Sequence, residues 1–529
     1  MHGKRTLDLV LTNANLITLD PFCPRAEAVA IGRSEILGIG TNSEASNLAG
    51  ARTQVIDYSG KTIVPGFIDS HIHLSSFAES LVTVNLEPRN NVHSISDIQM
   101  KIRQLSKKLP SGTWIRCGGY NEFHFAEHRH PTRQDLDLAS STHPIKLAHR
   151  SGHAHVLSSL ALKLTGITKK TPDPEGGLIE RDLKTGEPTG LLYGMGGSLA
   201  ALIPPLDAHQ LNRGIERASD ELLSLGITSV HDASFRNDYG RWERFKRWKA
   251  HGLLKQRVSV ILGVKGFEEY QTGNFSGEEG EPGLRVGGIK VLLDETTGRL
   301  NPSQDELNEL VFAIHRSGLR VVIHAIEENP IEAACTAIEY ALRQSPRRDH
   351  RHRIEHCSVC PPSLARRIAS LGVVIVTQPS FIYYSGDRYL KTVANSQLKY
   401  LYPIRTLIEN GVHVAAGSDC PVAPPDPMIG IYSAISRMSE TEETVGVKEG
   451  ISPVDALRLY TDYAARTSFE ETTKGSITPR TLADLVVLSD DPTAVPPEEV
   501  QNITVEMTIL GGKVVWDRNG LADDASFDV

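Results

Sequence analysis

Eight short apolar segments with strand character run through the middle of the chain and restrict it to an α/β fold. Amphipathic stretches separate most of them, such as QDELNELVFAIHRSG, in which apolar residues recur with helical spacing. Alternating strands and helices predict a parallel sheet, and eight strands favour a (β/α)8 TIM-type barrel. An open doubly wound sheet has the same periodicity and is the alternative. The expected strands are residues 62–70, 226–233, 257–263, 287–295, 319–327, 352–357, 372–380 and 411–419.

The sequence around these strands predicts two additional parts. Residues 1–62 and 470–529 contain short alternating strands with Gly and Asn breaks, so we expect both termini to form one small β-sandwich. The first two barrel strands are separated by about 150 residues, far more than a βα connection needs. We therefore assign residues 85–210 to an inserted α/β subdomain, and residues 63–84 and 211–469 to the barrel.

The composition is close to that of ordinary soluble globular proteins, and we expect an enzyme with a small-molecule substrate. A net charge of −8 argues against a nucleic-acid-binding protein, which normally carries a basic face. No uninterrupted apolar stretch of about 18 residues predicts a membrane span. The polar start of the chain lacks the apolar core of a signal peptide. We expect a cytoplasmic enzyme with no nucleic-acid or membrane partner, and the sequence leaves a homodimer open.

Histidines and one aspartate stand at the ends of predicted barrel strands. His71 and His73 are two positions apart, so their side chains point the same way on a strand, although two solvated histidines would look the same. His324, His356 and Asp419 end three other strands. The carboxyl ends of barrel strands meet at one mouth. We therefore expect these groups to converge on a divalent metal such as zinc, manganese or iron.

Two further residues near these strand ends carry charge in apolar surroundings. Lys290 lies inside the apolar segment GGIKVLLDE, where an unpaired positive charge would be costly. Either it forms a buried ion pair with Asp294, Glu295 or another carboxylate, or it is a ligand or active-site group. Asp69 precedes His71 by two residues, and we expect it to orient one imidazole of the histidine pair.

These residues and their surroundings resemble the amidohydrolase superfamily over nearly the whole chain. The similar segments are VPGFIDSHIHL, the Lys290 strand, HAIE, HRIEH, GSDCPV with PPDP, and KGSI with LADLVVL. Four others, HPTRQDLD, HRSGHAHVL, PDPEGGLI and GEPTG, are similar to the amidohydrolase 3 branch, which includes N-substituted formamide deformylases. The resemblance implies a metal-dependent amidohydrolase acting on carbon–nitrogen bonds other than peptide bonds.

The resemblance also implies a role for each site residue. The His-x-His pair and Asp419 would hold one metal ion, and His324 and His356 would hold a second. Lys290 would bridge the two ions as a carboxylated lysine. The implied cofactor is a divalent metal, zinc foremost, as one or two ions. Many members of the branch have Asp-Gly a few residues after this lysine, whereas this chain has LLDETTGRL.

The implied chemistry is hydrolysis by a metal-activated water, because zinc-type ions lower the pKa of bound water to about 7. Asp419 would act as the general base and would then pass the proton to the leaving nitrogen. Two other functions stay open. One is deamination, or hydrolysis of a different bond, on the same metal site. The other is a catalytically inactive binding or assembly protein, although such a protein would be expected to have lost metal ligands.

Substrate contacts are expected from loops. Tyr120, Arg150 and His153 lie in the predicted insertion, where HRSGH offers donors for a carbonyl or carboxylate. An ordinary surface loop explains these residues equally well. His231 ends the second barrel strand and Asp294 follows the Lys290 strand, and we add both to the predicted substrate-binding set.

Overall fold

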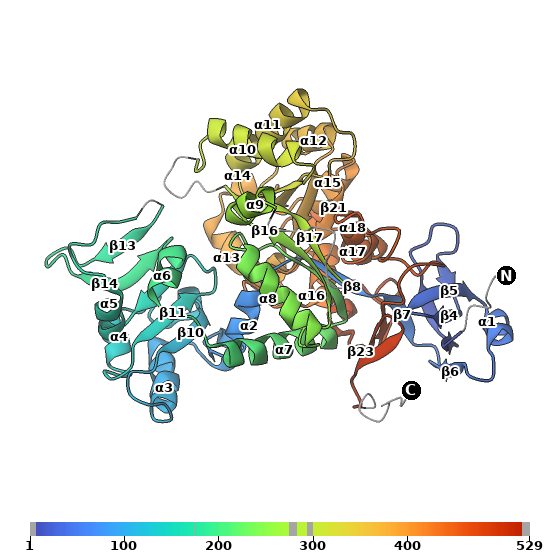
Figure 1. The fold of residues 1–529 in the computed structure, drawn as a ribbon, viewed down its shortest axis with the longest axis horizontal. Helices are drawn as coiled ribbons and strands as arrows, with labels where there is room; N and C mark the ends of the chain where they lie inside the picture. The colour runs from blue at the N-terminus through green and yellow to red at the C-terminus, as the bar shows by residue number, and fades with distance from the viewer. Residues whose placement is uncertain (1–6, 175, 274–282, 294–299, 521–529) are drawn as a thin grey trace. The chain divides into compact units, whose positions relative to one another are not determined.

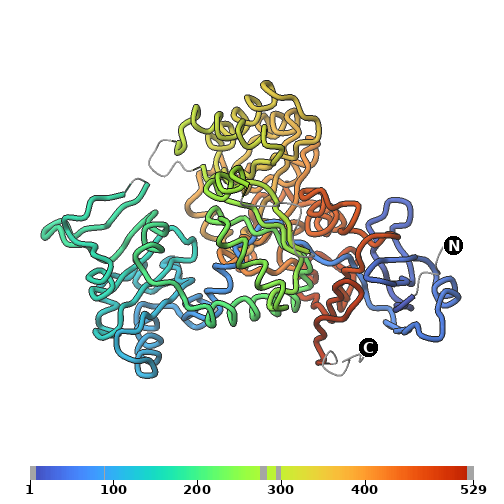
Figure 2. The backbone as a smooth tube through the Cα atoms, viewed as in Figure 1, coloured from blue at the N-terminus to red at the C-terminus, as the bar shows by residue number. Residues whose placement is uncertain are grey.

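The computed structural model describes residues 7–174, 176–273, 283–293 and 300–520. The chain divides into two compact units, one formed by residues 1–73 and 219–529 and the other by residues 74–218. Figures 1 and 2 trace the chain through both of them. Over the ranges just given, no helix combines the length and the apolar character needed to cross a bilayer.

The first unit is built around a sheet of eight parallel strands that forms a (β/α)8 barrel, which confirms the predicted fold. The strands pair in the order β21, β20, β19, β18, β17, β16, β15, β8. An isolated parallel bridge between Ile72 and Cys420 joins the two ends of this sheet, which excludes the open alternative. The strands are β8 (Phe67–Ile72), β15 (Ile227–Asp232), β16 (Arg257–Leu262), β17 (Leu284–Leu292), β18 (Val321–Ala325), β19 (Arg353–His356), β20 (Val374–Thr377) and β21 (Val414–Ala416).

A helix follows each of the strands β15 to β20 along the chain, the repeat that a βα barrel requires (Figure 1). These helices are α8 (Tyr239–Ala250), α9 (Val264–Gln271), α10 (Gln304–Arg316), α11 (Glu328–Gln344), α12 (Pro362–Leu371) and α13 (Ser380–Thr392). Ser303 and Glu306 form a capping box that satisfies N–H groups at the start of α10. The later helices are α14 (Asn395–Leu398), α15 (Ile404–Glu409), α16 (Pro427–Ser436), α17 (Pro453–Leu459) and α18 (Asp462–Arg466).

Strands from both ends of the chain build the predicted β-sandwich, which belongs to the same unit as the barrel. One sheet contains β5 (Glu35–Gly40), β4 (Ala28–Gly32), β1 (Leu9–Thr12) and β6 (Gln54–Asp57). The other contains β24 (Lys513–Asp517), β23 (Val505–Leu510), β22 (Leu485–Leu488), β7 (Thr62–Pro65), β2 (Asn15–Ile17) and β3 (Arg25–Ala26). Apolar side chains of both sheets form one buried core, including Leu11, Ile36, Ile63 and Leu485.

The first predicted barrel strand, residues 62–70, is in fact two strands that meet at Gly66. Strand β7 pairs with β22 and β2 in the sandwich, and β8 pairs with β15 in the barrel. A Cβ on Gly66 would lie only 2.3 Å from Thr228 Oγ1, so the absence of a side chain lets the chain pass from one sheet to the other. The sequence could not show this break because both halves are apolar.

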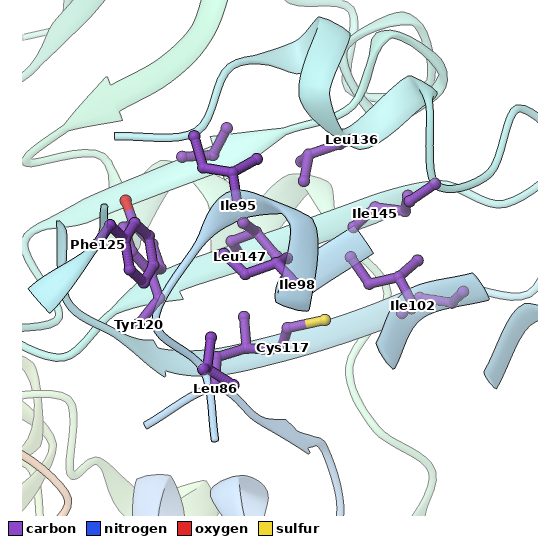
Figure 3. Packing of buried hydrophobic residues seen from close by; sticks show 14 of the residues in the cluster. Leu86, Ile95, Ile98, Ile102, Cys117, Tyr120, Phe125, Leu136, Ile145 and Leu147 are labelled. Carbon is purple, nitrogen blue, oxygen red and sulfur yellow. The ribbon is translucent and has the colours of Figure 1, made fainter. Parts of the chain in front are cut away.

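The second unit, residues 74–218, contains a mixed six-stranded sheet. Its strands are β13 (Leu178–Arg181), β14 (Pro188–Tyr193), β12 (Ala154–Leu157), β11 (Ile145–His149), β10 (Ile115–Tyr120) and β9 (Val84–Asn85). Ile95, Ile98 and Ile102 of α3 (Ile95–Ser106) pack on this sheet in a buried cluster with Cys117 and Leu147 (Figure 3). Its other helices include α2 (Leu74–Ser80), α4 (Arg133–Asp137), α5 (Ser159–Thr165) and α6 (Gly196–Leu202), and α7 (Ala208–Ser224) leads back to the barrel.

Candidate metal centre

The place where the barrel closes brings His71, His73 and Asp419 together. The Asp419 N–H donates to the carbonyl of His71 at 2.7 Å, and the His73 N–H donates to the carbonyl of Cys420 at 2.9 Å. These bonds connect the end of β8 to the segment after β21, two regions that are far apart in the sequence. Closure of the barrel therefore also assembles this group of side chains.

The donor atoms of these three residues all lie within 4.8 Å of one another. Asp419 Oδ1 is 3.4 Å from His71 Nε2 and 3.0 Å from His73 Nε2. Within the part of the chain that the structure describes, the buried His71 Nε2 has no hydrogen-bond partner. Two imidazole nitrogens and a carboxylate oxygen around one position form a donor set that suits zinc and similar divalent ions. These residues therefore fit a metal ion.

His324 and His356 extend the site across the mouth of the barrel. The His356 ring lies 4.9 Å from the His71 ring and 4.4 Å from the His324 ring, measured between centroids. Lys290 is buried on β17, and its Nζ makes no hydrogen bond to any residue in the described ranges. Burial lowers the pKa of Lys290 to about 8, although the charges of Glu355 and Asp419 oppose this shift. A buried amine beside these histidines fits a metal-linked lysine, whereas Asp294 and Glu295, the expected ion-pair partners, lie outside the described residues.

Three of the four histidines have their Nδ1 atom held by another side chain. His73 Nδ1 lies 3.0 Å from Ser234 Oγ, and His356 Nδ1 lies 2.8 Å from Gln378 Oε1. His71 Nδ1 contacts the Glu355 carboxylate. Such contacts fix the tautomer of an imidazole and leave Nε2 as the free donor atom. We did not predict Ser234, Glu355 or Gln378 from the sequence, although a buried glutamate one residue before His356 was a usable signal.

The electrostatics favour a neutral His71 and an ionised Asp419, the states that bind a cation. Burial lowers the pKa of His71 to about 3, and the nearby Lys290 adds to this effect. Burial raises the pKa of Asp419, but the hydrogen bond from His73 and the neighbouring His71 outweigh it and hold that pKa below its usual range. The protein therefore prepares the donor atoms in the form that metal binding needs.

Asp69 does not orient an imidazole in the way that we expected. Its Oδ1 accepts the backbone N–H groups of His71 and Ser418, each at 3.0 Å, and its Oδ2 accepts the Ser418 hydroxyl at 2.5 Å. Burial raises the pKa of Asp69 to about 6 against these hydrogen bonds. This side chain links β8 to the segment after β21 and so acts on the backbone that carries the site.

The predicted substrate residues are distributed between the two units. His231 is fully buried in the barrel, with its Nδ1 3.3 Å from Arg353 Nη1. Asp294 lies outside the described residues. In the second unit, Tyr120 is fully buried with its hydroxyl 3.0 Å from His130 Nδ1. In the same unit, Arg150 is half-buried and His153 is exposed.

Comparison with known proteins identifies relatives along nearly the whole chain. The profile of the amidohydrolase family matches residues 54–516. An N-substituted formamide deformylase of Arthrobacter pascens is 29% identical over 543 residues, covering 97% of this chain and 99% of that protein. The Arabidopsis thaliana protein LONG AFTER FAR-RED 3 is 28% identical over 547 residues, covering 96% of this chain and 91% of the relative. A solved structure of an uncharacterized metal-dependent hydrolase from Pyrococcus furiosus has a TM-score of 0.73 and 25% identity, covering 92% of this chain and 99% of that chain.

Proposed function

The chain belongs to the amidohydrolase family, and we propose that it is a metal-dependent hydrolase that cleaves a carbon–nitrogen bond of amide or formamide type in a small molecule. The observation that carries this proposal is the convergence of His71, His73 and Asp419, with donor atoms within 4.8 Å of one another. The similarity to a deformylase named for N-substituted formamides supports the choice of bond.

We assign the holding of one ion to His71, His73 and Asp419, and the holding of a second to His324 and His356. Carboxylation of Lys290 would supply oxygens to both ions. Addition of carbon dioxide to the neutral amine, with loss of one proton, converts the lysine into a carbamate anion. The buried Nζ, which lacks a hydrogen-bond partner in the described part of the chain, supports this assignment. Zinc is the metal that the nitrogen and oxygen donors favour.

When bound, such an ion polarises a carbonyl and lowers the pKa of a water from about 15.7 to about 7. Asp419 stands among the donor atoms, and its carboxylate is the group that accepts a proton from the attacking water. As the water oxygen bonds to the carbonyl carbon and the carbon–nitrogen bond breaks, Asp419 returns the proton to the leaving nitrogen. The products are a carboxylic acid and an amine. His71 and His73 would serve only to hold the ion.

The proposal is tested by a screen of N-formyl, N-acyl and cyclic amide compounds with zinc-loaded protein, in which amine release is measured. We expect turnover of at least one compound class, and a loss of about 100-fold or more in kcat for Asp419→Ala, since a general base contributes about 10²–10⁴-fold. Zinc-loaded protein that hydrolyses none of these compounds, or an Asp419→Ala variant with wild-type kcat, would overturn the proposal. Release of ammonia from amino-heterocycles alone would make the enzyme a deaminase instead.

A further inference from the structure

A buried ion pair on strand β19 lies directly behind the candidate metal centre. Arg353 and Glu355 are both fully buried, and their positions two residues apart place them on the same face of the strand. Arg353 Nε donates to Glu355 Oε1 at 2.5 Å, and its Nη2 donates to Oε2 at 2.9 Å. This two-point contact fixes the plane of the carboxylate as well as its position.

The same pair reaches His71 in two ways. The Glu355 carboxylate contacts His71 Nδ1 through Oε2. Arg353 Nη2 also donates to the carbonyl of Ser70, the residue before His71, at 2.8 Å. The opposite ring nitrogen of His71, Nε2, is the one that lies 3.4 Å from Asp419 Oδ1. Glu355 therefore contacts Nδ1 of His71, while Nε2 of the same ring faces the other candidate metal ligands.

A gain in folding stability is a weak explanation for a buried ion pair at this position. Burying two charges costs several kcal/mol per ion, and replacing a buried ion pair by apolar residues is often neutral or stabilising. The Glu355 carboxylate lies between the Arg353 guanidinium and Nδ1 of His71. This placement of a buried carboxylate points to a task at His71.

We propose that Glu355 is a positioning residue for His71, and that Arg353 holds Glu355 in place. The carboxylate keeps the proton of His71 on Nδ1, so that the lone pair of Nε2 points at the metal, and its charge makes that nitrogen a stronger donor. We assign Glu355 no ligand role, since its two oxygens face Arg353 and His71. The inference rests on the proposed metal-dependent function.

The test compares zinc affinity in Glu355→Gln and wild type, measured by competition with a chromophoric chelator. Partners of this kind usually contribute a factor of about 10–100 to metal affinity. We expect a loss of that size, together with a changed visible spectrum of the cobalt-substituted protein. Asp484→Asn is the matched control, because Asp484 forms a similar two-point pair with Arg257, at 2.6 and 2.9 Å, that is remote from the candidate ligands. This control should keep the zinc affinity and the cobalt spectrum of the wild type.

A second pair of variants separates positioning from folding, because Glu355→Gln leaves the buried Arg353 without its partner. Arg353→Met/Glu355→Gln and Arg353→Met/Glu355→Leu both remove the two charges. Only the glutamine variant keeps an oxygen that can accept the Nδ1 proton of His71. We expect the leucine variant to bind zinc about tenfold more weakly than the glutamine variant at similar unfolding free energy. Equal zinc affinity in these two variants, or equal affinity in Glu355→Gln and wild type, would overturn the inference.

These measurements do not depend on the substrate. A wild-type protein that binds zinc but hydrolyses no carbon–nitrogen compound contradicts the proposed function, while its zinc affinities still decide the role of Glu355. Full amidase activity combined with unchanged zinc affinity in the Glu355 variants contradicts the inference and leaves the proposed function standing.

Discussion

Gly417→Ala perturbs the metal centre through a single methyl group at the closure of the barrel. A Cβ at this position would lie 2.4 Å from the backbone nitrogen of His71, 2.6 Å from its Cβ and 2.9 Å from its Cα. Real Cβ contacts essentially never fall below 3.0 Å, so β8 and the segment after β21 would have to separate by at least about 0.6 Å. The neighbouring atoms belong to the backbone and the base of a side chain, which cannot rotate away.

The expected loss of stability has two sources. Forcing an extra methyl into a packed site costs about 1–3 kcal/mol. Separation also breaks two backbone hydrogen bonds across the closure of the barrel, from Asp419 to His71 and from His73 to Cys420. Each such bond contributes about 0.5–1.5 kcal/mol to stability. We therefore expect a decrease of about 2–6 kcal/mol in the free energy of unfolding. Metal sites need distances correct to about 0.2 Å, so zinc affinity should fall by more than tenfold.

Denaturant unfolding and chelator competition measure these two effects. Gly118→Ala is the control, because Gly118 lies on strand β10 and its added Cβ meets no atom within 4 Å. The control should unfold within about 1 kcal/mol of wild type, in line with ordinary Gly to Ala changes. A Gly417→Ala protein with wild-type stability and zinc affinity would refute the link between closure and metal binding.

Two further predictions concern Lys290 and the buried histidines below the site. Lys290→Met removes the amine but keeps a chain of similar length, so zinc titration of the purified protein should show one ion bound where the wild type binds two; an unchanged stoichiometry would contradict a bridging lysine. His352 is buried with its Nε2 2.8 Å from His315 Nδ1, and burial holds its pKa well below the usual value. Below about pH 6.5 the unfolded chain gains a proton that folded His352 does not, so stability falls as the pH falls. The stability advantage of wild type over His352→Asn should therefore shrink between pH 7 and pH 5 by up to about 1.4 kcal/mol per pH unit; a constant difference in urea unfolding would contradict this.

The barrel could be predicted from the sequence because its strands are buried on both faces. A segment such as VVIHA, residues 321–325, is apolar except for His324 near its carboxyl end. The passage from β7 to β8 at Gly66 could not be predicted, since the sequence is equally apolar on both sides of Gly66. Only the close approach of Gly66 to Thr228 in the folded chain marks the break between the two strands. The pairing of Ile72 with Cys420 could not be predicted either, because it exists only when the barrel closes.

The candidate ligands were visible because histidines and an aspartate stand near the carboxyl ends of several apolar strands, which meet at one mouth of a barrel. The side chains that contact these ligands could not be predicted, because they come from other strands of the barrel. Gln378 reaches His356 only because β19 and β20 are neighbours in the sheet. Glu355 could have been noticed as an acid inside a buried strand, but its contact with His71 of β8 depends on the barrel being closed. The sequence therefore indicated the candidate ligands, whereas the side chains that contact them could be identified only from the three-dimensional arrangement.

The position of a bound metal ion is the most direct test of the proposed metal centre. Crystals grown with zinc, measured on both sides of the zinc absorption edge, locate the ion by its anomalous scattering. We predict a peak bonded to His71 Nε2, His73 Nε2 and Asp419, with any second peak at His324 and His356. Zinc bound elsewhere, or no peak at these donors in zinc-loaded crystals, would contradict it.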